Sequence, residues 1–375
     1  MPLLEVEDLR VSFPTPDGVV HAVRGVGFVL DRGRTLGVVG ESGSGKSVAT
    51  QTIVGLTQGA RVSGHARFEG VDLLTMTPEQ LRAIRGVKIG MVFQDPLSSL
   101  HPYYRVGWQI VEMLRAHTDM KKDAAHRRAV ELLGMVGIPQ PKRRAEEYPH
   151  QFSGGMRQRV MIAMALALNP ALLIADEPTT ALDVTVQAQI IELMKKVQTE
   201  FGTAIIMITH DLGVIADMAD DVMIMYAGRV MEQVDRRNAY YRPHHPYTVG
   251  LLESLPEASR EDERLLSIPG QPPSLIDPPS GCAFHPRCRF VMPRCRVDEP
   301  PLQRVGGDSV HHSACWLPGD LLGVSAETDA DRARAALEAG GGTPESAEMS
   351  RPAEPTGTVR TGQTLDMGAA EEDNP

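Results

Sequence analysis

The chain has 375 residues, more than the roughly 250 to 300 at which a single hydrophobic core stops growing, so we expect one large domain with additions or two domains. Hydrophobic residues make up 42% of the chain and charged residues 23%, which excludes global disorder. The net charge of −10 comes mostly from residues 319–375, which hold 12 acidic residues and four arginines and leave only −2 for the first 318 residues.

The apolar stretches of the chain are short. Those at residues 160–168 and 204–208 fall well below the ~18 to 20 residues needed to cross a bilayer. The N-terminus also lacks a basic segment followed by an apolar run and a cleavage site. We therefore expect a chain that does not span a membrane and stays in the cytoplasm.

The N-terminal part of the chain predicts strands followed by a phosphate-binding loop. Residues 3–30, which include an alternating stretch at residues 19–23, indicate antiparallel strands beside a nucleotide. Residues 36–40 form a short apolar run, and residues 40–47 match G-x-x-x-x-G-K-S ahead of an apolar-periodic helix. In this loop the glycines let backbone N–H groups approach phosphate oxygens, the lysine reaches the β and γ phosphates, and the final serine is placed to bind Mg²⁺. The residues expected to hold a nucleotide triphosphate are Gly40, Glu41, Ser42, Gly43, Ser44, Gly45, Lys46 and Ser47.

A helical region and a second anion site are expected next. Amphipathic segments at residues 79–85 and 107–134 predict a helical subdomain at about residues 76–160. Ser153, Gly154 and Gly155 precede a long helical run, so they are expected at a helix N-terminus with free N–H groups. Lys46 and Ser153 are 107 positions apart. Either the fold or a second copy of the chain must therefore bring the two anion sites together.

A second strand is expected to complete the metal site. Residues 171–175 are fully apolar, as in buried parallel strands, and Asp176 and Glu177 follow at the edge where ligands bind. We expect Asp176 to hold Mg²⁺ through water. Glu177, which has no partner in the local sequence, suits a general base that polarises the attacking water.

The ordered set of motifs resembles the nucleotide-binding subunit of ATP-binding-cassette (ABC) transporters over residues 4–232. By this resemblance, Phe13 corresponds to the aromatic residue that stacks on adenine, and a buried core aromatic is the alternative. Gln94 corresponds to the Q-loop residue that coordinates Mg²⁺ and moves with the γ-phosphate. Asp183 corresponds to the D-loop residue, and His210 to the switch histidine that could donate to the γ-phosphate. Residues 152–156 resemble the family's signature, with Phe152 as a variant first residue.

The resemblance implies the fold, the assembly and the location. The fold is α/β, a P-loop ABC ATPase core with a RecA-like mixed sheet, an antiparallel β subdomain and a helical subdomain. Two subunits sandwich two ATP molecules head to tail, so that each signature closes on the other subunit's phosphate loop. The implied partners are a second ABC ATPase subunit, expected as a paralogue in a heterodimer, two transmembrane permease subunits and an extracytoplasmic peptide-binding protein, with no nucleic acid. The chain is then peripheral, at the cytoplasmic face of the cell membrane.

Further stretches, at residues 148–159, 245–248 and 268–273, resemble the oligopeptide and dipeptide importer branch of the family, which also includes nickel importers. His101 departs from the usual Ser-Leu-Asn-Pro of that branch. The implied function is ATP hydrolysis coupled to uptake of di- and oligopeptides. The alternatives are nickel import and a cassette ATPase that moves no solute, as in DNA repair, chromosome organisation or ribosome rescue. A further alternative makes the cysteine segment a redox sensor.

All four cysteines, Cys282, Cys288, Cys295 and Cys315, lie within one short segment. Because disulfides are disfavoured in a reducing cytoplasm, metal ligation is the leading explanation, and the absence of C-x-x-C spacing counts against a zinc ribbon. Four thiolates on a Pro-rich loop suit an iron–sulfur cluster, and the segment resembles the one that carries a 4Fe-4S cluster in the peptide-importer branch. Zn²⁺ and inert packed thiols remain alternatives. We expect the nearby histidines to be loop residues, not ligands: His285, His311 and His312.

Three regions are expected along the chain. Residues 1–235 form the ABC nucleotide-binding domain, and residues 236–318 form a C-terminal region of the oligopeptide-importer type with the four-cysteine metal site. Residues 319–375 are rich in Ala, Gly, Glu, Pro and Thr, with too few large apolar side chains to offset the entropy of ordering. We expect an acidic disordered tail there and assign it no role.

Overall fold

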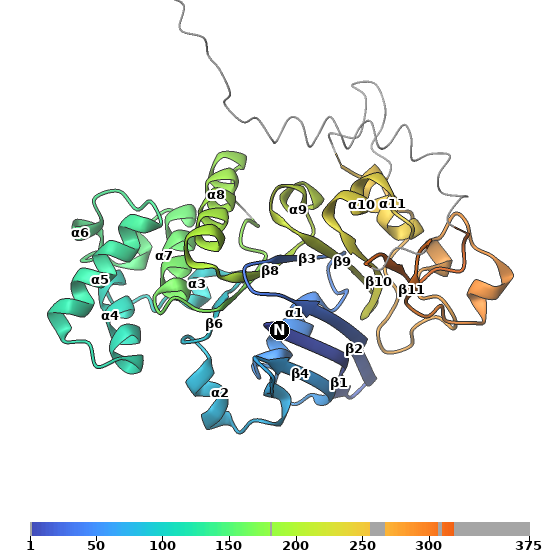
Figure 1. Ribbon diagram of the computed structural model, residues 1–375, viewed down its shortest axis with the longest axis horizontal. Coiled ribbons are helices and arrows are strands. Elements are labelled where there is room, and N and C mark those ends of the chain that lie inside the picture. The colour runs from blue at the N-terminus through green and yellow to red at the C-terminus, as the bar shows by residue number, and fades with distance from the viewer. Residues whose placement is uncertain (1, 181, 256–266, 307–309, 319–375) are drawn as a thin grey trace, which may run out of the picture. The chain divides into compact units, whose positions relative to one another are not determined.

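Figure 1 shows the computed structural model of the protein, which describes residues 2–180, 182–255, 267–306 and 310–318. The expected acidic tail lies outside the described residues. The strands are β1 (Leu4–Thr15), β2 (Gly18–Leu30), β3 (Thr35–Val39), β4 (Arg61–Phe68), β5 (Val71–Asp72), β6 (Ile89–Val92), β7 (Leu172–Asp176), β8 (Ala204–Thr209), β9 (Asp221–Tyr226), β10 (Arg229–Asp235), β11 (Gln303–Arg304) and β12 (His312–Ser313).

The α-helices are α1 (Lys46–Ile53), α2 (Pro78–Ile84), α3 (Pro96–Ser99), α4 (Val106–His117), α5 (Lys122–Met135), α6 (Pro141–Arg144), α7 (Gly154–Leu166), α8 (Val184–Phe201), α9 (Leu212–Met218), α10 (Arg236–Tyr241) and α11 (Pro246–Glu253). Short 3₁₀ turns are η1 (Leu73–Thr75), η2 (Pro149–Gln151), η4 (His285–Arg287) and η5 (Pro293–Arg296). Among the helices described, none combines the length and the hydropathy of a bilayer-spanning segment.

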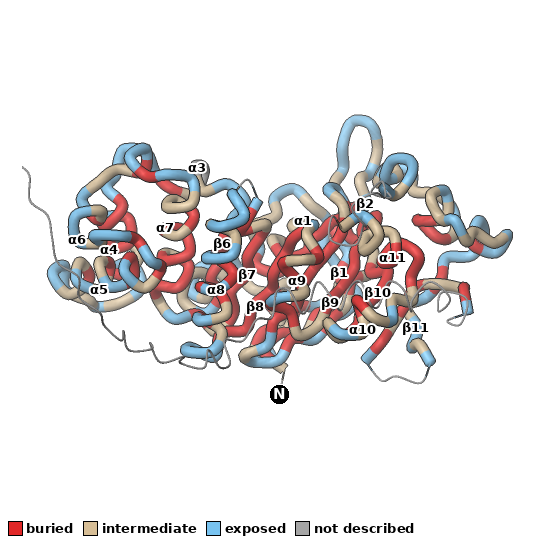
Figure 2. Tube along the Cα trace, turned by 90° about the horizontal axis from the view of Figure 1, so that it is seen from above, coloured by how far each residue is buried: buried red, intermediate tan, exposed pale blue. Residues whose placement is uncertain are grey.

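The larger sheet has eight strands in the order β11-β12-β10-β9-β3-β8-β7-β6. Its central strands β9, β3, β8, β7 and β6 are parallel. All residues of β3, β7 and β8 are buried, which explains why the sequence shows unbroken apolar runs there and no alternation. Figure 2 shows these strands as a buried layer. Because parallel strands end at the same edge, the segments after β3, β7 and β8 meet there.

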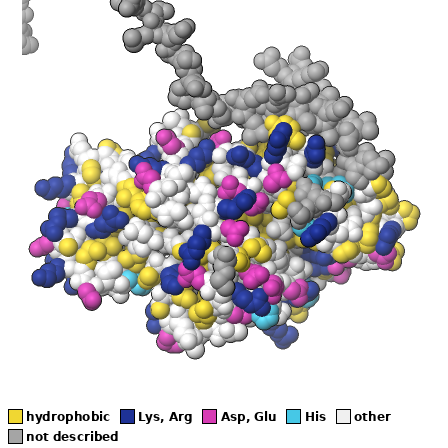
Figure 3. All heavy atoms as spheres, in the orientation of Figure 1, with side chains coloured by type: hydrophobic (Ala, Val, Ile, Leu, Met, Phe, Trp, Pro, Cys, Tyr) yellow, Lys and Arg dark blue, Asp and Glu magenta, His cyan; other side chains and the backbone are white. Residues whose placement is uncertain are grey.

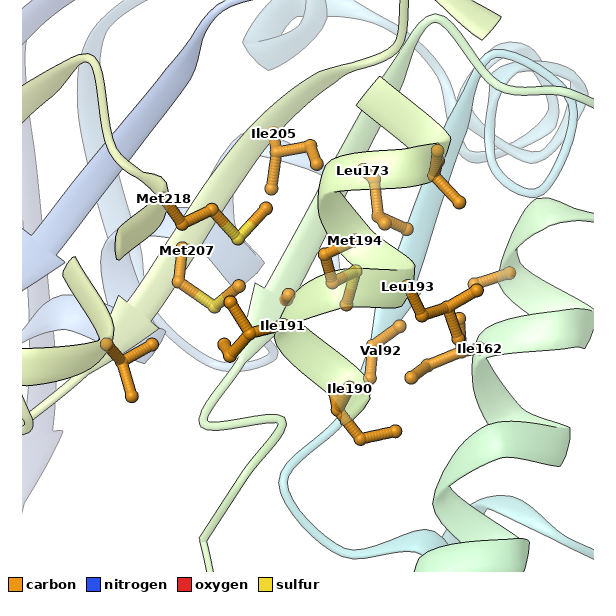
Figure 4. Close-up of a cluster of buried hydrophobic side chains, with 14 of the residues drawn as sticks. Val92, Ile162, Leu173, Ile190, Ile191, Leu193, Met194, Ile205, Met207 and Met218 are labelled. Carbon is orange, nitrogen blue, oxygen red and sulfur yellow. The ribbon is translucent and has the colours of Figure 1, made fainter. Parts of the chain in front are cut away.

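Alternate residues of the central strands face two different cores. Leu173 and Ile205 belong to a cluster with helix α8, whose Ile190, Ile191 and Met194 pack on the sheet (Figure 4). Leu172 and Ile206, on the other face, belong to a second cluster shared with α1 and the antiparallel strands. The sheet is therefore the middle of three layers, with helices α8 and α9 on one face (Figure 1).

The antiparallel strands expected in residues 3–30 are confirmed. β1 and β2 pair from Leu4 with Leu30 to Thr15 with Gly18, and they form a four-stranded sheet in the order β2-β1-β4-β5. Inward-facing residues such as Val6 and Phe28 are buried in the second cluster. The strands thereby cover α1 and the loop that precedes it.

Helices α3 to α7 gather at one end of the larger sheet (Figure 1). Residues such as Ile110, Leu132 and Ile162 join them to the first cluster. Helix α2 falls within the range expected for the helical region, but it packs against a different core from helices α3 to α7. Its Leu81 and Ile84 pack against the second cluster, with the antiparallel strands. The apolar side of α2 faces a different core from that of α4 and α5.

The C-terminal region joins the larger sheet and its core. β12 pairs with β10, and the Leu275 carbonyl accepts a hydrogen bond from the amide of His21 on β2. Tyr247 and Phe284 are buried in the first cluster. On the face of the molecule shown in Figure 3, acidic and basic side chains of the described residues are interspersed, in keeping with the small net charge of the first 318 residues.

Candidate active site

The phosphate loop lies between β3 and α1 and depends on two glycines. Gly40 and Gly45 have φ angles of 157° and 98°, and a Cβ atom there would come within 2.1 Å of the Met225 carbonyl and 2.3 Å of the Ala22 carbonyl. Only glycine lets the loop pass between these two backbone segments. Helix α1 begins directly after the loop with no side chain capping its first N–H groups. These free donors suit an anion.

Lys46 is buried under the loop. Its Nζ donates to the carbonyl oxygens of Gly40 at 2.6 Å and Glu41 at 3.0 Å. Burial lowers the pKa of Lys46, and the negative charges of Glu177 and Asp176 oppose that shift. A buried ammonium beside free helix N–H groups fits a phosphate, whose charge compensates the lysine better than neutral carbonyls do.

Ser47 and Asp176 are brought together from α1 and the end of β7. The Ser47 hydroxyl donates to Oδ1 of Asp176 at 2.8 Å. Burial raises the pKa of Asp176, and the charge of Glu177 adds to the shift, while hydrogen bonds from Ser47 and Gln51 oppose it. A buried carboxylate and a hydroxyl at the edge of the sheet are oxygen donors of the kind Mg²⁺ prefers, so these residues fit the expected ion.

Glu177 is the centre of a polar cluster. Its Oε2 accepts from Nε2 of Gln94 at 3.1 Å and from the hydroxyl of Thr180 at 2.9 Å, and it lies 3.6 Å from Nδ1 of His210. Gln94 therefore contacts the expected base, and its role as a Mg²⁺ ligand stays a prediction. The expectation that Glu177 has no local partner was wrong, because Thr180 follows three residues later in the same turn. A hydroxyl three residues after a carboxylate was the signal that sequence analysis missed.

The backbone of Glu177 has a φ of 47°, in the left-handed region that non-glycine residues avoid. Its amide donates to the carbonyl of Ile208 at 2.9 Å, which ties the turn to β8. The Glu177 side chain is only 15% exposed. Such strained residues persist where their surroundings fix them, often at functional sites.

The second expected anion site lies at the start of α7. Ser153 is the N-cap, and its hydroxyl accepts from the amide of Met156 at 3.3 Å. Gly154 is exposed, and Gly155 lies close to Val186 of α8. Figure 1 places α7 among the helices at the end of the sheet, away from α1. The described residues of a single chain thus do not bring the two anion sites together.

Asp183 and Phe13, two further residues named from the family resemblance, lie at the start of a helix and on a strand. Asp183 is the N-cap of α8, and its Oδ1 accepts from the amide of Val186 at 2.9 Å. Phe13 lies on β1 opposite Val20, and its half-buried ring packs against the second core cluster.

Sequence analysis missed the contacts that the C-terminal region makes with the phosphate loop. The hydroxyl of Tyr247, on α11, accepts from the amide of Glu41 at 2.9 Å. Arg287 donates to both carboxylate oxygens of Glu41, at 2.6 and 3.0 Å. The motif at residues 245–248 had marked the importer branch but carried no role. No pattern in the sequence pointed to Arg287.

The four cysteines are free thiols that line one cavity of about 20 Å³. Burial raises the pKa of Cys282 to about 11 and that of Cys315 to about 12. In the described part of the chain, no group of three or more His, Cys, Asp or Glu side chains is arranged so that it could hold a metal ion. Four thiols are a donor set of the kind that an iron–sulfur cluster uses, and neutral packed thiols are the alternative.

The nearby histidines have other contacts. Nε2 of His311 lies 2.6 Å from the buried carboxylate of Glu232, and Nδ1 of His285 lies 3.0 Å from the carbonyl of Cys282. His312 lies on β12 and pairs with Gln233 of β10. His285 also lines the cysteine cavity, together with His245.

Comparison with protein families gives two matches. The model of the ABC transporter family matches residues 23–180, and that of the oligopeptide/dipeptide transporter C-terminal region matches residues 231–295. The first match contains the phosphate loop, the start of α7 and Glu177. The second contains Tyr247, Arg287 and three of the four cysteines.

Curated relatives match over most of their length. The oligopeptide transport ATP-binding protein OppD of Bacillus subtilis is 54% identical over 320 residues, which cover 84% of this chain and 88% of the relative. OppD of Escherichia coli is 52% identical, over 85% of this chain and 94% of the relative. The dipeptide transport ATP-binding protein DppD of Bacillus subtilis is 50% identical, over 84% and 94%.

Solved structures confirm the expected P-loop ATPase core. A dimeric, post-hydrolysis form of the ATP-binding cassette MJ0796 with ADP and phosphate superposes with a TM-score of 0.57 at 28% identity, over 62% of this chain and 98% of that one. The cassette cbiO1 of Clostridium perfringens gives 0.54 at 30% identity, over 64% and 90%.

Proposed function

The chain belongs to the ABC transporter family, among the ATP-binding subunits of oligopeptide and dipeptide transporters, and on that premise we propose that it hydrolyses ATP to power the uptake of di- and oligopeptides. The observation that carries the proposal is the position of Glu177. It lies one residue beyond the carboxylate that contacts Ser47, with Gln94, Thr180 and His210 around it. This is the arrangement needed to activate water beside a bound triphosphate.

ATP binding uses donors that the chain already presents. Lys46 exchanges the carbonyls of Gly40 and Glu41 for phosphate oxygens, and the free N–H groups of the loop and of α1 point at the same anion. Ser47 and Asp176 would hold Mg²⁺, which neutralises charge on the β and γ phosphates. Phe13, at the end of β1, would stack on the adenine.

Hydrolysis relies on Glu177 as the general base. Its carboxylate accepts a proton from the attacking water, and Thr180 and Gln94 fix its orientation. His210, which is exposed beside it, donates to the γ-phosphate. Because Gln94 lies on the segment between β6 and α3, its movement links the chemistry to the helical region.

The complete site requires a second ATPase subunit. Ser153, Gly154, Gly155 and Asp183 would face the triphosphate held by the other subunit, with the amides that follow Ser153 as the second anchor. The MJ0796 cassette is described as a dimer, which supports this arrangement. We propose a paralogue as the second subunit, with two membrane permeases and an extracytoplasmic peptide-binding protein, and a peripheral location at the cytoplasmic face of the membrane. ATP closes the pair because each γ-phosphate gains donors from both subunits.

The test is Glu177→Gln, which keeps the shape of the side chain and removes its basicity. Turnover should fall by about a hundredfold or more, whereas binding of MgATP should persist and closed dimers should accumulate. Hydrolysis would be measured by phosphate release, and dimers by sedimentation. Normal turnover in this variant would place the base elsewhere and overturn the mechanism.

We also propose that Cys282, Cys288, Cys295 and Cys315 form a small metal module that holds a 4Fe-4S cluster. Support comes from the four thiols that line one cavity. When bound, the cluster would supply a rigid cross-link between four chain positions.

Iron and acid-labile sulfide in anaerobically purified protein test this module. We expect about four of each per chain and a brown colour, both lost on replacing Cys295 with Ser. Colourless protein with one zinc per chain would instead support the Zn²⁺ alternative, and metal-free protein the inert thiols.

A further inference from the structure

Arg287 forms a buried ion pair with the phosphate loop. Its side chain is 5% exposed, and it binds both carboxylate oxygens of Glu41. The same guanidinium donates to the carbonyls of Ile268 and Pro269 at 3.2 and 2.9 Å and to the hydroxyl of Tyr226 at 3.3 Å. The ion pair with Glu41 is bidentate, and all three nitrogens of the guanidinium donate hydrogen bonds. Its geometry is therefore fixed, unlike that of a surface ion pair.

Glu41 is held at both ends by the C-terminal region. Tyr247 accepts from its amide, Arg287 binds its carboxylate, and its carbonyl accepts from Lys46. An unpaired carboxylate at this position would repel a triphosphate. The positive charge of Arg287 offsets the charge of Glu41 and so reduces this repulsion. Tyr226, Tyr247 and Phe284 pack their rings around this contact, with centroids 4.8 to 5.3 Å apart.

The turn that carries Arg287 also carries the cysteines. The amide of Arg287 donates to the carbonyl of Phe284 at 3.0 Å, and the next residue, Cys288, donates to His285 at 3.3 Å. The His285 amide donates in turn to the carbonyl of Cys282 at 2.9 Å. Four residues that line the cysteine cavity are therefore part of the same short turn as Arg287: Cys282, Phe284, His285 and Cys288.

We propose that Arg287 is a positioning residue of the ATP site, which neutralises Glu41 and couples the phosphate loop to the cysteine segment. The role rests on the proposed ATPase function. Coupling is reciprocal: the state of the cysteines alters ATP affinity, and bound ATP shifts the equilibrium between the states of the cysteine segment by the same free energy, which changes how fast the thiols react.

Charge rescue tests the first half of the proposal. Arg287→Met should weaken MgATP binding about tenfold, and adding Glu41→Gln should restore it to within about threefold of the original, because the unpaired carboxylate is gone. The KM for ATP should rise more than kcat falls. Arg289→Met is the matched control, since Arg289 lies in the same loop but pairs with Glu253 at 3.0 and 2.6 Å. Equal effects of the two arginine variants, or no rescue, would overturn the role.

Thiol reactivity tests the coupling. The chain has four cysteines, all in this segment, so when the chain is in its reduced form with the four thiols free, its reaction with dithiodipyridine reports on this segment alone. A saturating non-hydrolysable ATP analogue with Mg²⁺ should slow the reaction about threefold or more in the unmodified chain and in Arg289→Met, but not in Arg287→Met. Equal slowing in Arg287→Met, or none in the unmodified chain, would refute the coupling.

Two further variants keep the test decisive if Arg287→Met does not fold. Glu41→Gln breaks the pair from the loop side, and Arg287→Lys keeps the charge but loses the two-pronged geometry. Both should abolish the effect of ATP on thiol reactivity. If the unmodified chain binds no MgATP, the ATPase function is refuted. If the unmodified chain hydrolyses ATP and Arg287→Met does so with the same kinetics, only the role of Arg287 is refuted.

Discussion

Glu177 is held by residues from three segments of the chain before any nucleotide arrives. Gln94 follows β6, Thr180 lies in the same turn, and His210 follows β8. The left-handed backbone of Glu177 costs on the order of 1 kcal/mol, which the fold must offset. The direction of the carboxylate is therefore fixed by tertiary contacts. Sequence motifs predicted Glu177, Gln94 and His210 as site candidates, but not the single oxygen on which they converge.

Asp176 should impose a stability cost on the nucleotide-free chain. Because burial raises its pKa, the folded chain favours the protonated carboxyl more than the unfolded chain does. Ionisation therefore destabilises the fold above the raised pKa, and the cost disappears below the usual range of an aspartate. Asp176→Asn, which can still accept from Ser47, should raise the melting temperature at pH 7 by on the order of 2 °C while abolishing Mg²⁺-dependent hydrolysis.

Thermal unfolding of both proteins between pH 4 and 8, without nucleotide, measures this difference. The advantage of Asp176→Asn should shrink as the pH falls toward 4. An advantage that grows on acidification would contradict the assigned cause.

The two helix N-termini proposed as anion sites differ in local chemistry. Helix α1 follows Gly45 and has no side-chain cap, whereas α7 is capped by the hydroxyl of Ser153. The phosphate loop therefore offers its N–H groups directly. At α7 the hydroxyl satisfies the amide of Met156, and a Cβ atom added at Gly154 would meet nothing within 4 Å.

Ser153→Asp should separate helix stability from assembly. Aspartate caps a helix as well as serine does, and its charge suits the helix dipole, so the melting temperature should not fall. The same charge would repel a triphosphate held by the other subunit. ATP-dependent association of the Glu177→Gln chain with its co-purified ATPase partner should weaken by at least about tenfold.

Sedimentation with and without MgATP measures this association. Ser153→Asn, a neutral cap of similar strength, is the control and should associate more strongly than Ser153→Asp. Unchanged association of Ser153→Asp would remove this helix terminus from the site.

At the scale of the molecule, the C-terminal region completes the core of the nucleotide-binding fold. Tyr247 and Phe284 pack in the same cluster as the central sheet, and β12 covers the edge of β10. Arg24 and Arg229 both pair with Glu299, which ties the region to β2 and β10 as well. The expected boundary after residue 235 is therefore crossed by hydrophobic, strand-pairing and ionic contacts.

A chain truncated after Asp235 should fail to fold on its own. Its loss of α10, α11 and β12 exposes the apolar surface around Tyr226 and the open edge of β10, both of which favour aggregation. Solubility on expression and circular dichroism measure the outcome. A chain ending at Pro318 keeps every described contact and should fold normally. A soluble, cooperatively unfolding 1–235 fragment would show that the domain is independent.

The sequence by itself determined the elements whose signals are local: the loop between β3 and α1, the acidic pair after an unbroken apolar strand, and the serine ahead of α7. Short-range periodicity and turn chemistry carry that information, so these positions could be predicted. Only the tertiary structure decided which distant side chains meet. Glu41 and Arg287 are 246 positions apart, and neither strand alternation nor helical periodicity encodes such a partner. Their contact arises because the C-terminal segment folds back over the edge of the sheet at which the parallel strands end, where burial makes an unpaired charge too costly to leave alone.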